Sequence, residues 1–126
     1  MRTLLVGIGG FVGSVLRYWL SGLAQSAAPA ASFPLGTLAV NVTGCLVIGV
    51  LAELAEARGF LGSDARALLL VGVLGGYTTF SAFANETVIA IRDGAVATAA
   101  VNVLVTVTAC LVAVWVGRVT ANVIWR

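Results

Sequence analysis

Apolar residues in this chain gather into four long stretches that are separated by short polar segments. A helix that crosses a bilayer needs roughly 20 mostly apolar residues, each adding about 1.5 Å of rise. The pattern therefore predicts an all-α protein, multi-pass in the cell (plasma) membrane. Its single domain, 1–126, is expected to hold four transmembrane helices over residues 4–24, 36–54, 67–91 and 95–119.

The connections between these stretches are short, which limits how the helices can be arranged. Residues 25–34 form a linker of small residues with proline, residues 56–66 are polar and carry both signs of charge, and residues 92–94 form a tight turn. Helices joined by such loops pack as antiparallel neighbours. The apolar run after Met1 continues to Leu20, so we interpret it as a retained membrane helix and not as a signal peptide.

Composition excludes several classes of function. Hydrophobic residues make up 60% of the chain and charged residues 10%, which lies outside the range of soluble domains. All seven basic residues are Arg and none forms a charge run, so we expect no nucleic-acid partner. The chain has no His, and its two cysteines, Cys45 and Cys110, lie in apolar stretches. We therefore expect no zinc site and no enzyme activity. Packing is the favoured role of the cysteines, with a disulfide between them as the alternative.

The third apolar stretch contains the most unusual segment of the sequence. Gly75 and Gly76 are followed closely by Thr78 and Thr79, and both residue types lower helix propensity. Backbone carbonyls released at mid-membrane must find another partner. This pattern predicts a third helix that is broken at mid-membrane and that presents carbonyl oxygens to a cation.

Aromatic and polar residues follow this predicted break. Phe80 and Phe83 are three residues apart and share one helix face, and an aromatic ring has a positive edge that stabilises a dehydrated anion. Ser81 and Asn85 add hydroxyl and amide donors on another face. The donors suit an anion better than a cation. The competing interpretation of the Phe pair is ordinary core packing.

Polar residues inside the other stretches need partners as well. Arg17 and Glu86 approach the same membrane side if the helices alternate in direction, which predicts either an ion pair or two side chains that snorkel to the interface. Asn41 is expected to bond to a neighbouring helix or to line a path. The fourth stretch carries a polar stripe that either lines a path or bridges helices, formed by Thr98, Asn102, Thr106 and Cys110.

Glycine spacing predicts close helix packing. The pairs Gly9/Gly13 and Gly72/Gly76 each have the spacing that lets another backbone approach, and in lipid such contacts replace the hydrophobic effect as the source of association. Four short helices cannot easily enclose an aqueous path, so the polar positions need a second protomer to face. We therefore predict a homodimer.

Three segments together resemble the Fluc (CrcB) family of fluoride channels. They match in order, spacing and chain length, and they are Gly9–Gly13 with Arg17–Tyr18, Gly36–Leu38 with Val40–Asn41 and Gly44, and Gly75–Glu86. The resemblance implies an antiparallel, dual-topology homodimer with two fluoride pathways. It also implies a central structural sodium ion held by backbone carbonyls that map onto Gly75 and Thr78.

The resemblance also assigns roles to individual side chains. It implies that Asn41 is a pore-lining amide, that Phe80 and Phe83 form an aromatic box, and that Ser81 belongs to a polar track. It places Arg17 and Glu86 near a vestibule as functional or structural charges. Ala82 departs from the hydroxyl residue often found in this segment, and the fourth-helix stripe matches the family only in part. The implied function is passive export of fluoride that entered the cell as hydrogen fluoride.

Two other functions compete with this interpretation. A small multidrug-type exporter, coupled to protons, has a similar length and four helices, but it relies on a carboxylate in its first helix, and this first stretch has none. The second competing function is that of a non-transporting assembly subunit, whose glycines would serve packing alone. Dual insertion expects balanced charge, whereas the arginines favour one side. Arg17 and Arg92 lie towards one side, and the opposite side holds Arg2, Arg58, Arg66, Arg118 and Arg126.

Overall fold

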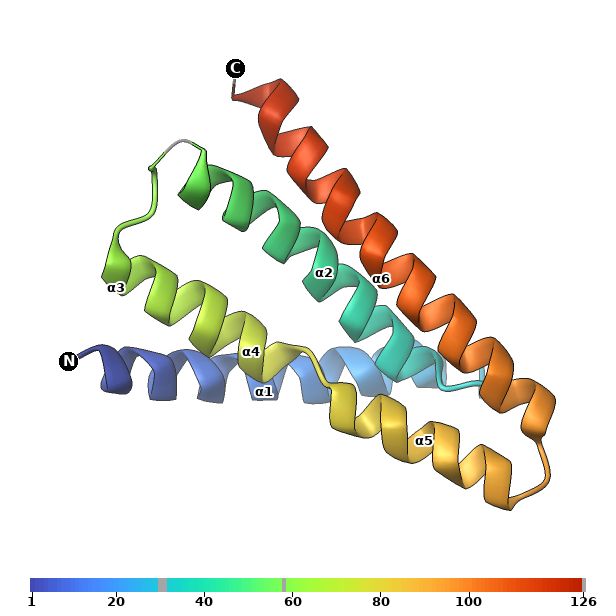
Figure 1. Ribbon diagram of the computed structural model, residues 1–126. Coiled ribbons are helices and arrows are strands. Elements are labelled where there is room, and N and C mark those ends of the chain that lie inside the picture. Colours follow the sequence, from blue (N-terminus) through green and yellow to red (C-terminus); the bar gives the residue numbers. More distant parts are fainter. Residues whose placement is uncertain (30–31, 58, 126) are drawn as a thin grey trace.

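The computed structural model describes residues 1–29, 32–57 and 59–125, and within these ranges the regular structure is entirely helical. Figure 1 shows long helices joined by short connections. The elements in chain order are α1 (Arg2–Ser26), α2 (Leu35–Glu56), α3 (Ser63–Arg66), the π-helical segment η1 (Ala67–Leu74), α4 (Gly75–Tyr77), α5 (Phe80–Arg92) and α6 (Val96–Ile124).

Within the described ranges, four helical spans are long and apolar enough to cross a membrane. They are Arg2–Ser26, Leu35–Glu56, Ser63–Arg92 and Val96–Ile124. The third span comprises α3, η1, α4 and α5, which follow one another in the chain. The predicted architecture of four membrane helices is therefore confirmed, and the chain is a multi-pass membrane protein.

All four spans extend beyond their predicted C-terminal ends, the third also begins earlier than predicted, and in the third and fourth spans polar side chains of the added turns have partners in other helices. The third span begins at Ser63, and the Asp64 carboxylate in its first turn lies 2.9 Å from the Arg2 guanidinium. The fourth span continues past residue 119 to Ile124, and in the added turn Asn122 Nδ2 donates to Glu53 Oε1 of α2 at 3.2 Å. An apolar stretch thus ends earlier than the helix that contains it.

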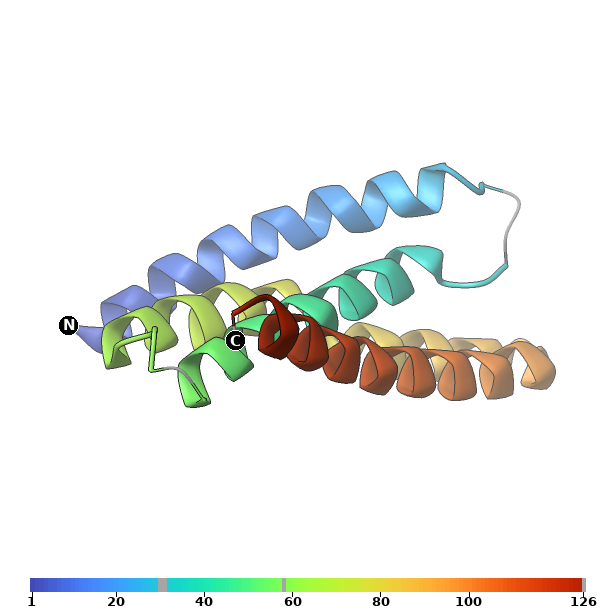
Figure 2. The same ribbon diagram turned by 90° about the horizontal axis from the view of Figure 1, so that it is seen from above.

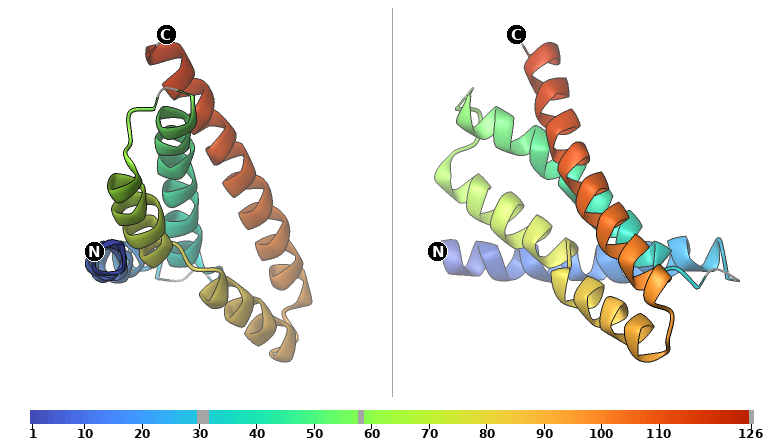
Figure 3. Two further views of the ribbon diagram at one scale, coloured as in Figure 1. Left: turned by 60° about the vertical axis from the view of Figure 1, so that its left-hand side comes forward. Right: turned by 45° about the vertical axis from the view of Figure 1, so that its right-hand side comes forward.

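The four spans alternate in direction, and each packs most closely against the span that runs parallel to it. α1 packs against η1, and α2 packs along α6 (Figure 3). Figure 2 shows both termini and the connection between α2 and α3 at one end of the molecule. The end of α1, the start of α2 and the turn between α5 and α6 lie at the other end, where α1 lies against the start of α2 and away from α5.

Glycines allow both of these close contacts. At Gly13 an added Cβ would lie less than 3.0 Å from the backbone of Val73, and at Gly76 it would lie 2.5 Å from the carbonyl oxygen of Gly10. At Gly49 and Gly117 an added Cβ would also lie less than 3.0 Å from a backbone oxygen of the other helix, across the contact between α2 and α6. The expected role of Gly13 and Gly76 in packing is confirmed.

The third span changes its backbone conformation at Thr78 and Thr79. Thr78 has φ −79° and ψ 157°, and Thr79 has φ −149° and ψ 110°, which are extended values. α4 therefore ends at Tyr77 and α5 begins at Phe80. Gly75 and Gly76, which precede this point, are still helical. The extended residues are thus the two threonines and not the glycine pair.

The arginines are distributed unequally between the two ends of the molecule. Arg2, Arg66 and Arg118 lie towards the end that holds the termini, where Arg66 donates to the carbonyl oxygens of Leu61 and Ala55. Arg92 ends α5 at the opposite end. The predicted positions of two further arginines, 58 and 126, lie outside the described residues.

Candidate functional site

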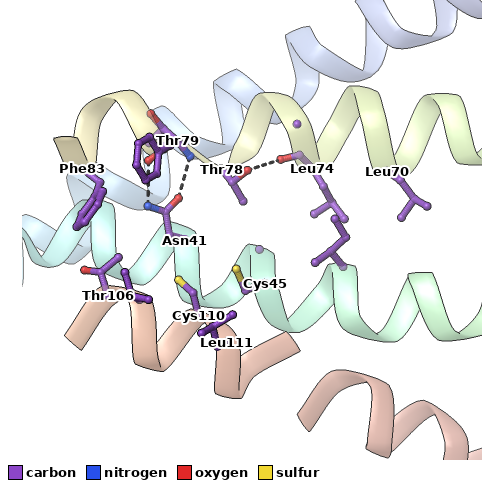
Figure 4. Close-up of a pocket in the computed structure, with 15 residues that line it drawn as sticks. Asn41, Cys45, Leu70, Leu74, Thr78, Thr79, Phe83, Thr106, Cys110 and Leu111 are labelled. Atoms are coloured by element: carbon purple, nitrogen blue, oxygen red, sulfur yellow. Dashed lines mark hydrogen bonds between the residues drawn. The ribbon is translucent and has the colours of Figure 1, made fainter. Parts of the chain in front are cut away.

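The side chain of Asn41 holds the extended backbone of Thr79. The Thr79 amide donates to Asn41 Oδ1 at 2.8 Å, and Asn41 Nδ2 donates to the Thr79 carbonyl oxygen at 3.0 Å (Figure 4). Both residues are buried. Because the amide side chain satisfies a donor and an acceptor that the helix no longer pairs, it stabilises the extended conformation.

This arrangement removes the usual hydrogen-bond donors from two backbone carbonyls. In an uninterrupted α-helix the Gly75 carbonyl would accept from the Thr79 amide, and the Thr78 carbonyl would accept from the Ala82 amide. Here the Thr79 amide donates to Asn41, and the Ala82 amide donates to Thr79 Oγ1 at 3.1 Å. Gly75 and Thr78 are the two residues whose carbonyls the family resemblance assigns to a cation.

The donor set at this point fits a hard cation. The two carbonyl oxygens lie where a helical run ends, and the end of a helix carries partial negative charge. Hard cations take oxygen ligands of this kind. The Thr78 hydroxyl is already used, since it donates to the Leu74 carbonyl oxygen at 2.9 Å. Thr78 can therefore contribute its carbonyl without any contribution from its side chain.

The two phenylalanines lie directly after the extended residues. Their ring centroids are 5.4 Å apart and the ring planes are inclined by 56°, so the rings are tilted against each other. Phe83 is buried, whereas Phe80 is 76% exposed within the single chain. Ser81 is also exposed, and its hydroxyl lies 3.2 Å from Thr79 Oγ1. The predicted aromatic pair is therefore in contact, but one protomer does not cover it.

A cavity of about 390 Å³ brings most of the predicted site residues together (Figure 4). It lies between α2, α6 and the third span, and it is open on one side. Its lining is mainly apolar with a few polar groups, as in most ligand sites. The residues that line it include Asn41, Cys45, Gly75, Thr78, Thr79, Phe80, Phe83, Thr106 and Cys110.

Arg17 and Glu86 line a second cavity of about 420 Å³, but they do not form the ion pair that their positions suggested. Within the described ranges no salt bridge joins them, and Glu86 Oε1 instead accepts from Thr37 Oγ1 at 2.6 Å. The other oxygen, Glu86 Oε2, is buried without a partner in the part of the chain that the structure describes. The ion-pair alternative is therefore not observed, because α1 diverges from α5 at this end (Figure 2) and Thr37 of α2 faces Glu86 directly.

The polar stripe of α6 both bridges helices and lines cavities. Asn102 Nδ2 donates to Thr87 Oγ1 at 2.9 Å, and Thr106 Oγ1 donates to Asn102 Oδ1 at 3.1 Å. Thr98 and Asn102 line a third cavity, of about 470 Å³, which Glu86 also reaches. Cys110 lines the first cavity and is free, as is Cys45. The disulfide alternative is therefore not observed.

Sequence reasoning missed three threonines that hold the site together. Thr37 binds Glu86, Thr79 caps α5, and Thr87 joins α5 to α6. The position of Thr37, one helical turn before Asn41, was a usable signal, because both side chains must lie on one face. The position of Thr79 before Phe80 was also a signal, since Thr is favoured as an N-cap.

Comparison with known proteins places this arrangement in a family. The family model described as CrcB-like protein, Camphor Resistance (CrcB), matches residues 4–118. A protein of Rhodospirillum rubrum named fluoride-specific ion channel FluC is 47% identical over 126 aligned positions, which cover 98% of this chain and 97% of that protein.

Further relatives carry the same name. The fluoride-specific ion channel FluC of Methylobacillus flagellatus is 46% identical over 92% of this chain and 91% of its own length. Fluoride-specific ion channel FluC 1 of Methanosarcina acetivorans is 40% identical over 94% of this chain and 88% of its own length. With the family model matched over nearly the whole chain and relatives this similar at full length, the chain belongs to the CrcB family.

Proposed function

We propose that the chain is the protomer of a fluoride-selective channel that exports fluoride passively. The observation that carries this proposal is the cavity that Asn41, Phe83 and Thr106 line together. Fluoride holds its water tightly, so a selective path must replace hydration with close donors and positive ring edges. The relatives named fluoride-specific ion channels support the same assignment.

The competing functions have less support. An exporter of the multidrug type needs a carboxylate in the first helix, and α1 contains no Asp or Glu. The relatives described above give it no support either. An assembly subunit would explain the glycine contacts, but it would not require the two hydrogen bonds between the Asn41 side chain and the Thr79 backbone. The relatives are named as ion channels, and this supports a channel and not an enzyme.

Liposomes that contain only this protein should release fluoride and retain chloride. We expect efflux down the fluoride gradient without any added energy source, because the pathway is passive. A fluoride electrode and a chloride electrode measure the two fluxes, and protein-free liposomes are the control. Equal efflux of both ions contradicts the proposed selectivity, and no efflux of either supports an assembly subunit.

We infer that the working unit is an antiparallel, dual-topology homodimer in the plasma membrane. Phe80 and Gly75 are exposed, and both line the first cavity, which is partly open. Carbonyls and donors that face lipid are costly, so a second protomer would stabilise this region. Residues Thr78 and Thr79 would then be the mid-membrane break of the third helix.

Such a dimer would also complete the cation site. Gly75 and Thr78 of each protomer offer two carbonyl oxygens, so two protomers together would offer four to one sodium ion. The bound ion would neutralise carbonyl ends that otherwise repel one another in a dry interface. The support within this chain is that both carbonyls lose their helical donors, as described above.

Removal of sodium should therefore weaken the dimer. We expect the dimer fraction and the fluoride flux to fall when purified protein is dialysed into sodium-free buffer, and to return when sodium is added. Size-exclusion chromatography with light scattering measures the first and a fluoride electrode the second. Thr78→Ala is the matched control, because it keeps the carbonyl and should respond to sodium as the wild type does. A sodium-independent dimer, or cross-links that trap only parallel protomers, would contradict the arrangement.

A further inference from the structure

Two cysteine thiols lie next to each other in the first cavity, one from α2 and one from α6 (Figure 4). Their proximity follows from the packing of these parallel helices. Gly49 on α2 lies against the carbonyl of Val114 on α6, where an added Cβ would collide. One helical turn earlier on each helix, four residues back, come Cys45 and Cys110. The close contact at Gly49 therefore brings the two thiols to the same level.

The surroundings of these thiols select for a soft ligand. No carboxylate or histidine lines this cavity in the part of the chain that the structure describes, and no cluster of three or more His, Cys, Asp or Glu side chains occurs there either. A zinc ion, which takes four ligands, would remain unsaturated. Sulfur ligands favour soft ions such as copper(I). Both cysteines are free and half-exposed towards the cavity, so their sulfur atoms are available.

We propose that Cys45 and Cys110 form a two-coordinate binding site for a soft monovalent metal cation of the copper(I) and silver(I) type. One thiol releases its proton to solvent and binds as a thiolate, and the other coordinates through a sulfur lone pair. The single positive charge of the metal is cancelled by the single thiolate, so the complex is neutral. Neutrality matters because a net charge inside a membrane protein is costly. No oxidant or reductant is consumed.

Silver binding to the purified protein in detergent tests this site, in a chloride-free nitrate buffer that contains a monothiol competitor. We expect one silver ion per wild-type chain and protection of both cysteines from maleimide. Cys45→Ser and Cys110→Ser should each lower the silver affinity by roughly 100-fold, since the second ligand otherwise binds intramolecularly. Two silver ions per chain, or a single-cysteine variant that binds as tightly as the wild type, would overturn the proposal. A mass loss of two hydrogens without bound silver would overturn it in favour of a disulfide.

The functional consequence rests on the proposed channel and is tested separately. The thiols share their cavity with Asn41, Phe83 and Thr106, so a metal bound there should obstruct the fluoride path. Relative to each protein's own flux without silver, we expect silver to block fluoride flux in wild-type liposomes, dithiothreitol to restore it, and silver to leave the flux of the double variant C45S/C110S unchanged. Fluoride flux that continues while silver is shown to be bound would mean that the two thiols do not lie on the fluoride path. Absence of flux before silver is added would count against the proposed channel and would leave the binding result intact.

Discussion

Gly76→Ala is expected to disturb the packing of α1 on the third span and to destabilise the chain by about 1–3 kcal/mol. The added Cβ would lie 2.5 Å from the Gly10 carbonyl oxygen and 2.9 Å from the Gly10 Cα. Neither is the flexible end of a side chain, so relief requires the two helices to separate. Because lipid gives no hydrophobic gain that would hold them together, the lost contact is not replaced. Unfolding in mixed detergent, followed by circular dichroism, measures the loss.

Gly75→Ala is the matched control for this substitution. It lies one residue away in the same short helix, with φ −64° and ψ −36°, and its added Cβ would meet nothing within 4 Å. The protomer should therefore keep its stability. An equal loss for both variants would show that helix propensity, and not the contact with Gly10, determines the effect. A variant that folds normally but no longer dimerises would place Gly75 against the second protomer.

Much of the fold could be predicted because it depends on patterns within short stretches of sequence. Twenty or so apolar residues and short linkers specify four alternating spans, and glycine spacing identified Gly13 and Gly76 as points of helix contact. Span ends were less accurate, since they depend on partners that are distant in sequence. The added turn of α6 contains Asn122, which bonds to Glu53 of α2, and no local pattern reveals that contact.

The site was predicted in outline, but its pairings were not. The run from Gly75 to Thr79 marked an irregular backbone, and the structure places extended residues at Thr78 and Thr79. Of the two alternatives for Glu86, the ion pair with Arg17 is not observed within the described residues, because helix direction indicates which residues share a membrane level but not how far α1 lies from α5. Thr37 bonds to Glu86 instead. The roles of Asn41, Phe80, Ser81 and Phe83 in conduction stay predictions.

Asn41→Leu is expected to cause the other large loss, in both stability and flux. The leucine has a similar volume but makes neither bond to Thr79, so the Thr79 amide and carbonyl remain buried. Each unsatisfied group costs about 1–3 kcal/mol, which gives a total of roughly 2–6 kcal/mol. The third span can recover part of this cost if the Thr79 amide returns to the Gly75 carbonyl, as in a continuous helix. That return would remove one proposed cation ligand, so the variant should be both less stable and insensitive to sodium.

Two further variants separate these effects. Asn41→Asp keeps an acceptor for the Thr79 amide but sets a carboxylate against the Thr79 carbonyl oxygen, which lies 3.0 Å from Nδ2 in the wild type. It should therefore lose stability as Asn41→Leu does while keeping the extended backbone. Asn122→Leu removes an exposed asparagine of α6 that bonds to Glu53 at 3.2 Å, and it should change stability by no more than about 0.5 kcal/mol. Detergent unfolding with and without sodium compares all three. If Asn41→Leu keeps the sodium response of the wild type, the hydrogen bonds from Asn41 to Thr79 do not determine whether the proposed carbonyl ligands are available to the cation.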